Sequence, residues 1–507
     1  MPDGPTQLVW FKRDLRVADH RPLVEAARRG PCLCVYIYEP DVVGAEDYDA
    51  CHLEFVNQSL AELRANLREL GGELILRVGR LPDAFAELHR RRPFQAIWAH
   101  EETGNAVTFA RDKRVATWAE QNGVGFYETY QHGVVRRLRD RDGWSRTWES
   151  RMSEPVLRRP ERVAAVDGVE PGRLYGAESL GLPSSTKHAA QHGGEALGRE
   201  ALDSFLNCRG SNYRSDMSSP VTGEDGCSRL STYLAYGCLS LKHVYQATER
   251  RTQQVRSARA RGEAVEPGWL QSLSAFGGRL RWHCHFMQKL EDEPRIEHEN
   301  MNRAYDGLRA DTPGDAGFNE GFFDAWRRGE TGYPMVDASM RALHQTGWIN
   351  FRMRAMLVSF ASYHLWLHWR RPAVFLARQF VDYEPGIHYS QFQMQAGATG
   401  INSVRIYSPI KQAADQDPHG VFLRRYLPEL AGVPDEHLAE PHKMPPLLQR
   451  DVGCVVGQHY PAPVVAHGPA YNEAKRRMDA HRKSAGVRQE ARRVMQKHGS
   501  RRRSRWR

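Results

Sequence analysis

The chain has 507 residues, 26% of them charged and 41% hydrophobic, so it is long enough for roughly two to four domains and is not a single small module. Its mean hydropathy is -0.62, and its longest apolar stretch, residues 355–369, contains serines and histidines, which excludes a membrane-spanning segment. The net charge is +10, and the eight cysteines lack any Cys-x-x-Cys pair, which argues against both a cysteine-ligated cluster and a disulfide framework.

The first 135 residues alternate short apolar runs with segments of helical period. The runs predict strands at residues 8–11, 32–38, 74–78, 96–98 and 124–129, and helices are predicted at 54–70 and 82–90. Such alternation predicts a doubly wound parallel sheet with helices on both faces. Ligands of such sheets lie beyond the carboxyl ends of the strands.

Residues 136–198 are rich in Arg, Pro, Gly and Ser, and predict a linker between domains. From 199 to 450 the pattern predicts an all-helical domain, with helices at 226–248, 269–289, 335–345 and 347–369. The last of these is apolar on nearly every face and should lie at the buried centre. The predicted fold is therefore α/β followed by all-α, with a proline-containing segment and basic tail at 451–507.

The charge excess lies entirely in this tail. Residues 475–507 carry a formal charge of +12, which leaves -2 for the rest of the chain. The last seven residues, 501–507, predict a disordered arm that binds nucleic acid by counterion release; a solubilising terminus is the alternative. Residues 1–7 lack a basic segment followed by an apolar one, so we expect no signal peptide and a cytoplasmic protein, nucleoid-associated if bacterial.

Three motifs contain the candidate functional residues. Residues 10–20, WFKRDLRVADH, follow the first strand and predict either ion pairs or a nucleotide site. Residues 213–220 and 227–240 place Ser228 and Ser231 at a helix start, where hydroxyls either cap the helix or bind phosphate. Residues 331–354, TGYPMVDASMRALHQTGWINFRMR, include Arg354 in an apolar helix, where it needs a partner if buried; Asp382 is the candidate.

These motifs closely resemble the photolyase and cryptochrome family over about 430 residues. The resemblance implies an α/β antenna domain and a helical domain that holds FAD in a U shape. It places Arg354 and Asp382 beside the isoalloxazine ring, where a fixed cation favours the reduced anionic flavin. The FAD-binding residues that it implies are Tyr213, Cys227, Ser228, Arg229, Leu230, Ser231, Arg354, Asp382, Tyr383, Glu384 and His388.

The resemblance also implies a cavity above the flavin that receives a flipped-out pyrimidine dimer of UV-damaged DNA. Such a cavity needs aromatic walls for the bases and cations for the phosphates. The DNA-binding residues implied are Arg281, Trp282, His283, Phe351, Arg352, Lys411 and Gln412, with Asn350 also facing the cavity. A metal site at residues 283–285 is not expected, because neighbours at this spacing lie on different helix faces.

Several positions depart from the family pattern and bear on catalysis. Phe351 stands where many members carry asparagine, and His388 stands near the flavin N5, where it is either a proton donor or a packed core residue. Phe392 replaces the tryptophan nearest the flavin, while Trp369 fits the middle position of the electron-transfer chain. Tyr363, Trp366 and Trp369 form either a substitute stripe on one helix or plain core. The predicted catalytic residues are His388, Asn350, Trp366 and Trp369.

In the first domain, Glu101 and Glu102 follow the fourth strand, where a folate, a deazaflavin or another flavin could bind as antenna. We expect a monomeric DNA photolyase, a carbon–carbon lyase, that uses FAD. A cryptochrome-type photoreceptor is the main alternative. An adenylyl-transfer or other nucleotide-binding α/β protein would explain only the first domain.

Overall fold

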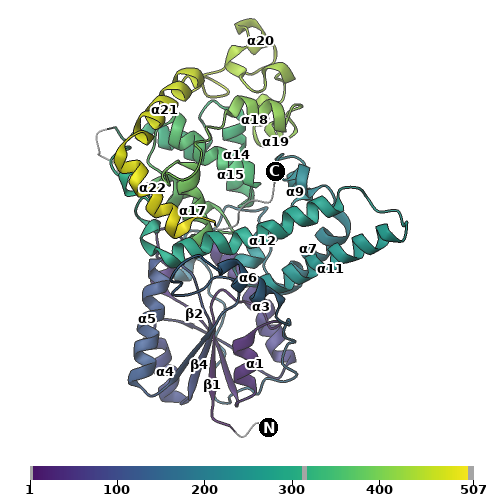
Figure 1. The fold of residues 1–507 in the computed structure, drawn as a ribbon, viewed down its shortest axis with the longest axis vertical. Coiled ribbons are helices and arrows are strands. Elements are labelled where there is room, and N and C mark those ends of the chain that lie inside the picture. The colour runs from purple at the N-terminus through teal and green to yellow at the C-terminus, as the bar shows by residue number, and fades with distance from the viewer. Residues whose placement is uncertain (1–3, 311–316, 501–507) are drawn as a thin grey trace.

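The computed structural model describes residues 4–310 and 317–500. A sheet flanked by helices forms one part of the molecule and a set of helices forms the other, with α12 (Trp269–Asp292) crossing the junction between them (Figure 1). Within the described residues, no helix is both long enough and apolar enough to cross a membrane.

The first part contains one five-stranded parallel sheet in the order β3-β2-β1-β4-β5. Its strands are β1 (Gln7–Phe11), β2 (Cys32–Tyr38), β3 (Leu74–Val78), β4 (Ala96–His100) and β5 (Gly125–Thr129). In β1 the apolar side chains alternate between two cores: Val9 packs with α1 (Arg21–Ala27) and α3 (Ala50–Glu69), whereas Leu8 packs with α4 (Asp83–Arg91) and α5 (Ala106–Gln121). The doubly wound sheet is confirmed.

The order of this sheet reverses at β1, which pairs with β2 on one side and β4 on the other; Val9 lies opposite both Cys34 and Trp98. The connections that leave β1 and β4 therefore diverge, and a crevice opens at their carboxyl ends. The short α2 (Pro40–Val43) lies beyond the end of β2.

The second part is helical, as predicted. Its helices, apart from α12 and the last two, are α7 (Glu195–Ser204), α8 (Tyr213–Asp216), α9 (Gly223–Gly226), α10 (Ser231–Ala235), α11 (Leu241–Ala260), α13 (Glu320–Arg328), α14 (Pro334–Thr346), α15 (Phe351–Ser359), α16 (Arg370–Gln379), α17 (Pro385–Gln395), α18 (Pro409–Gln416), α19 (Val421–Tyr426) and α20 (Pro446–Asp451).

Two predicted helices are shorter than expected. Residues 226–248 break between α10 and α11 at Gly237, whose φ is 63° and whose Cβ would lie 2.2 Å from the Arg13 carbonyl oxygen. Residues 347–369 form α15 and one π-helical turn, Phe360–His364, after which Trp366 adopts a left-handed φ of 54°. Of the two alternatives for Tyr363, Trp366 and Trp369, a stripe on one helix face is therefore wrong.

The predicted linker, residues 136–198, contains α6 (Trp144–Ser153) and the start of α7. Its middle lies along the sheet: Ala165 forms a bridge with Cys32, and Val163 is fully buried. The domain boundaries themselves remain predictions.

Most of the basic tail is helical and packed. It forms α21 (His467–Arg482) and α22 (Ala485–His498), which lie along the outer edge of the helical part (Figure 1). Helix α22 buries Val487 and Val494, and Arg493 forms an ion pair with Glu293 at 3.2 Å. The predicted arm, residues 501–507, lies outside the described residues.

Candidate functional site

Most of the predicted FAD-binding residues line one cavity of about 320 Å³ in the helical part. Its walls come from α12, α15 and α17, from the segment before α10 and from the loop after α16. The predicted residues that line it are Tyr213, Cys227, Ser228, Arg229, Ser231, Trp282, His283, Phe351, Arg354, Asp382, Tyr383, Glu384 and His388. The predicted residues that do not are Leu230, Arg281, Asn350, Arg352, Trp366, Trp369, Lys411 and Gln412.

Arg354 and Asp382 form the charged wall of this cavity. The two guanidinium NH2 groups donate to the two Asp382 oxygens at 2.9 Å each, and the Arg354 Nε donates to the Ile349 carbonyl. Burial raises the pKa of Asp382, but Arg354, together with the Ser231 hydroxyl and Arg229, holds it below its usual value. The Arg354 side chain stays 24% exposed, so a fixed cation faces the cavity.

The segment before α10 forms the polar wall. Arg229 has a left-handed φ of 59°, and its guanidinium lies 3.9 Å from the centre of the Trp348 ring. Arg209, which sequence reasoning missed, donates to the carbonyl oxygens of Cys227 and Ser228 and holds this segment in place. The hydroxyls of Ser228 and Ser231 therefore stand at the cavity beside a strained, fixed backbone.

These residues fit a flavin dinucleotide. The cavity combines apolar walls, which suit a planar ring, with a fixed guanidinium and with hydroxyls at a helix start, which suit phosphates. Arg354 would lie at the flavin ring and Ser228 and Ser231 at the phosphates, as the sequence resemblance implies.

His388 lines the cavity as a neutral ring. Burial lowers its pKa to about 4, and its Nε2 lies 2.8 Å from the Ala373 carbonyl oxygen. A carbonyl can only accept, so Nε2 carries the proton and donates it there. This geometry supports the packed core histidine over the proton donor.

The mouth of the cavity is aromatic. The exposed fractions of Trp282 and Phe351 are 47% and 40%, unusually high for such side chains. Trp282 stacks on Phe286 with ring centres 5.4 Å apart, and the Arg279 guanidinium lies 5.5 Å from the Phe351 ring centre. Two open aromatic faces with a cation beside them suit unpaired bases.

Asn350 and Arg352 do not line the cavity, although both were expected to face it. The Asn350 amide is buried and donates to the carbonyl oxygens of Met217 and Ser218 at 3.1 and 3.0 Å. Arg352 donates to the Ser218 hydroxyl. Their contacts in this structure therefore hold the 217–218 segment.

The remaining predicted DNA-binding residues lie apart from the flavin cavity. Arg281 forms an ion pair with Glu149 at 2.9 Å. Lys411 and Gln412 line a separate groove between α18 and α21, together with Arg405, His467 and Tyr471. The buried Gln412 Oε1 accepts no hydrogen bond from the described residues.

Trp366 and Trp369 do not line this cavity either. Trp369 is fully buried, and its Nε1 donates to Asn300 Oδ1 at 2.8 Å. Trp366 lies between the guanidinium groups of Arg309 and Arg477, at 4.5 and 4.9 Å from its ring centre. The two rings belong to different apolar clusters.

A second cavity, here called the strand-end cavity, lies at the carboxyl ends of β1, β2 and β4. Its lining residues include Trp10, Lys12, Tyr38, Glu39, Asp47, Glu102, Arg111 and Tyr383. Glu102 is paired with Arg111 at 2.5 Å and with Lys12 at 3.9 Å, and Glu101 is not among the lining residues. The position matches the crevice expected for an antenna, whose identity remains a prediction.

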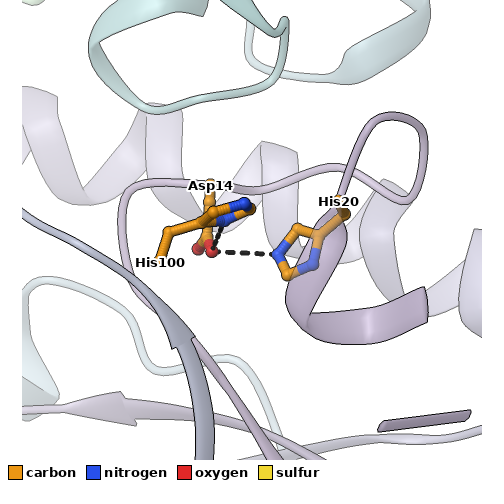
Figure 2. Close-up of side chains that lie close together, drawn as sticks. All are labelled: Asp14, His20 and His100. Carbon is orange, nitrogen blue, oxygen red and sulfur yellow. Dashed lines mark hydrogen bonds and ion pairs between the residues drawn. The ribbon is translucent and has the colours of Figure 1, made fainter. Parts of the chain in front are cut away.

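Residues 10–20 join the two parts of the molecule. Leu15 N donates to the Tyr236 carbonyl, and Arg13 donates to the carbonyl oxygens of Ala235 and Tyr383. The turn is held by Asp14, whose Oδ2 lies 2.9 Å from His20 Nε2 and 2.7 Å from His100 Nδ1 (Figure 2).

This trio has the composition of a metal site, but its hydrogen bonds indicate otherwise. His20 Nδ1 accepts from Leu23 N at 3.1 Å, so His20 Nε2 carries a proton and donates to Asp14. Burial raises the pKa of Asp14, but the two histidines bring it well below its usual value. The trio is a charged hydrogen-bond centre that shapes the junction.

Comparison with known proteins agrees with this geometry. The family profile described as "FAD binding domain of DNA photolyase" matches residues 276–480, and the profile "DNA photolyase" matches residues 7–140. A cryptochrome DASH of Gloeobacter violaceus is 28% identical, with 92% of this chain and 95% of that protein covered.

A deoxyribodipyrimidine photo-lyase of Alkalihalophilus pseudofirmus is 26% identical, with 92% of this chain and 96% of that protein covered. The crystal structure of a bacterial class III photolyase from Agrobacterium tumefaciens has a TM-score of 0.82 and 26% identity, and covers 95% of this chain and 98% of that one. The chain therefore belongs to the photolyase and cryptochrome family, and its helical part contains the FAD-binding domain of that family.

Proposed function

We propose that this protein is a light-driven DNA photolyase that repairs a flipped-out pyrimidine dimer of UV-damaged DNA. Reduced FAD held by Arg354, Ser228 and Ser231 would supply the electron that splits the lesion and would regain it afterwards, so the reaction would have no net redox change.

The observation that carries this proposal is the open aromatic mouth. Trp282 and Phe351, both close to half exposed, flank the cavity that Arg354 and Asp382 line further in. A dimer stacked between these rings would lie directly beside the flavin. Relatives named deoxyribodipyrimidine photo-lyase, at 26% and 27% identity, support repair.

Cations at the mouth and on the neighbouring surface would hold the DNA backbone. Arg279 lies at the Phe351 ring, and Lys411, 71% exposed at its side chain, lines the separate groove between α18 and α21. The five arginines at residues 501–507 would add phosphate contacts, each of which steepens the salt dependence of binding by about 0.9 in log K against log salt.

A photoreceptor is the second candidate, and one observation favours it. The Asn350 amide already donates hydrogen bonds to the carbonyl oxygens of Met217 and Ser218. The neighbouring residue in the wall of the flavin cavity is Phe351, which cannot hydrogen-bond a lesion. Relatives named cryptochrome DASH match as well as the photolyases do.

A repair assay separates the two. The FAD-loaded protein is reduced with dithionite and mixed with oligonucleotides carrying one cyclobutane or one (6-4) lesion, single- and double-stranded, in blue light and in the dark. Light-dependent restoration of either lesion is expected, and Trp282→Ala should lower it at least roughly tenfold through lost base stacking. No restoration of any substrate by fully reduced protein would overturn the proposal and favour the photoreceptor.

A further inference from the structure

Tyr383 forms part of the wall between the two cavities. It lines both the flavin cavity and the strand-end cavity and lies in the short loop between α16 and α17. Only 7% of the residue is exposed, and its ring contacts that of His388 at 5.2 Å between centres. The phenol ring is therefore held rigidly at the flavin cavity.

The hydroxyl of Tyr383 donates to Asp47 Oδ2 at 2.5 Å, the length of a charge-assisted hydrogen bond. Asp47 comes from the α/β part, and 3% of it is exposed. Its other donors are neutral: the Asn105 amide at 3.0 and 3.2 Å and, more distantly, the Tyr389 hydroxyl at 3.5 Å. Across residues 4–310 and 317–500, no ion pair involves Asp47. Among the described residues, no cation therefore competes with the Tyr383 hydroxyl for this oxygen.

The resting proton stays on the phenol. Burial, followed by the nearby Tyr389 and Asp47, raises the pKa of Tyr383 well above its ordinary value. A phenol gives up an electron far more easily when its proton can leave at the same time, and a positioned base removes the energetic cost of a buried cation.

We propose that Tyr383 is the immediate electron donor to the light-excited, oxidised flavin, with Asp47 as its proton acceptor. Tyr383 loses one electron to the flavin, its O–H bond breaks, and the proton moves to Asp47 Oδ2; a neutral phenoxyl radical and a neutral carboxyl group remain. The proposal rests on FAD binding in this cavity and deepens the proposed function, because it concerns how the flavin becomes reduced.

Aromatic neighbours provide a path for restoring the phenol. Tyr389 lies 6.4 Å from Tyr383, and Trp369 lies 6.4 Å from Tyr389, between ring centres. His368 contacts Trp369 at 5.5 Å. A thiol in solution would supply one electron along this path, becoming a thiyl radical and releasing its proton to water, and the proton on Asp47 would return to the Tyr383 oxygen. Phe392, which also lines the flavin cavity, has no proton to release and cannot take this role.

The test uses the full chain with oxidised FAD and no DNA. Wild type, Tyr383→Phe and Asp47→Asn are compared with Tyr48→Phe as the matched control, because Tyr48 lines the strand-end cavity but not the flavin cavity. Flash excitation is followed by transient absorption and by electron paramagnetic resonance for the phenoxyl radical, in H2O and D2O. Flavin content is read from the visible absorption of each variant.

We expect a phenoxyl signal in wild type and in Tyr48→Phe, formed more slowly in D2O. Tyr383→Phe should lose the signal, and Asp47→Asn should form it roughly a hundredfold more slowly, the low end of what a positioned base contributes. A wild-type signal that persists in Tyr383→Phe, or a rate unchanged in Asp47→Asn, would overturn the proposal. If Tyr383→Phe fails to retain FAD, Asp47→Asn decides. Because the repair assay starts from chemically reduced protein, failure of repair and failure of this donor are separate results.

Discussion

The two cavities that meet at residues 382–385 arrange their charges in opposite ways. In the flavin cavity, the ion pair of Arg354 and Asp382 lines the open volume, and the Arg354 side chain remains 24% exposed. In the strand-end cavity, Arg111 binds Glu39, Glu102 and Asp112 at once, and its side chain is only 5% exposed. In the flavin cavity the guanidinium of Arg354 can therefore contact a ligand. In the strand-end cavity the guanidinium of Arg111 is already paired with carboxylates of the protein.

This difference separates ligand sites from structural networks better than residue type does. The charged run that begins at Lys12 predicted either ion pairs or a nucleotide site, and the structure shows Lys12 within 4 Å of three carboxylates, those of Glu102, Asp112 and Glu128. A buried charge that already has several partners is costly to remove, and it offers less to a ligand.

The largest effect is expected from Arg111→Met in the strand-end cavity. The substitution keeps the aliphatic stem but leaves three buried carboxylates without their shared cation, which should lower the free energy of unfolding by about 3–5 kcal/mol. Chemical denaturation measures this loss, and the folded fraction should retain FAD. Arg114→Met, on the same helix with a side chain 46% exposed, is the control and should cost less than about 1 kcal/mol. Equal losses in the two variants would contradict a closed network.

Arg354→Met, the same change in the flavin cavity, should weaken FAD binding as well as stability, because Asp382 loses its counter-charge. Loss of a charged hydrogen-bonding group is worth about 1.5–3 kcal/mol, so the Kd for FAD should rise roughly tenfold to a hundredfold. Titration of the apoprotein with FAD measures this, and Arg378→Met, exposed on α16 and paired with Asp49 at 3.5 Å, is the control. If Arg354→Met lowers stability as much as Arg111→Met but binds FAD normally, the comparison between the cavities fails.

The local sequence pattern predicted helices and strands well where their bounds do not depend on contacts with residues far away in the sequence. The bounds of β2 and β3 agree with the apolar runs at 32–38 and 74–78, because a buried parallel strand needs a continuous apolar run. The Arg354–Asp382 pair was also foreseeable, since a guanidinium in an apolar helix needs a buried counter-charge.

What the sequence could not predict depends on contacts across the chain. Gly237 breaks a helix because the backbone of Arg13 approaches it, and Asn350 turns from the cavity because Met217 and Ser218 offer carbonyls. Arg209 and Asp47 carried no local signal, because their partners lie at other places in the sequence.

A pH-dependent effect is expected where the two cavities meet, at Glu384. Burial raises the pKa of its carboxyl group to about 7, although Arg13 lies 3.6 Å away and opposes the shift. The unfolded chain releases this proton near pH 4.3, so between about pH 4.3 and 7 the folded state binds more protons, and stability falls as pH rises through this window. Glu384→Gln removes that contribution. As the pH rises from 4.5 to 8, the free energy of unfolding of the variant should therefore rise by up to about 3 kcal/mol relative to that of wild type. Unfolding free energies at the two pH values measure this. A difference that does not change with pH would mean that Arg13 keeps Glu384 charged, and that the junction belongs with the closed network of the strand-end cavity.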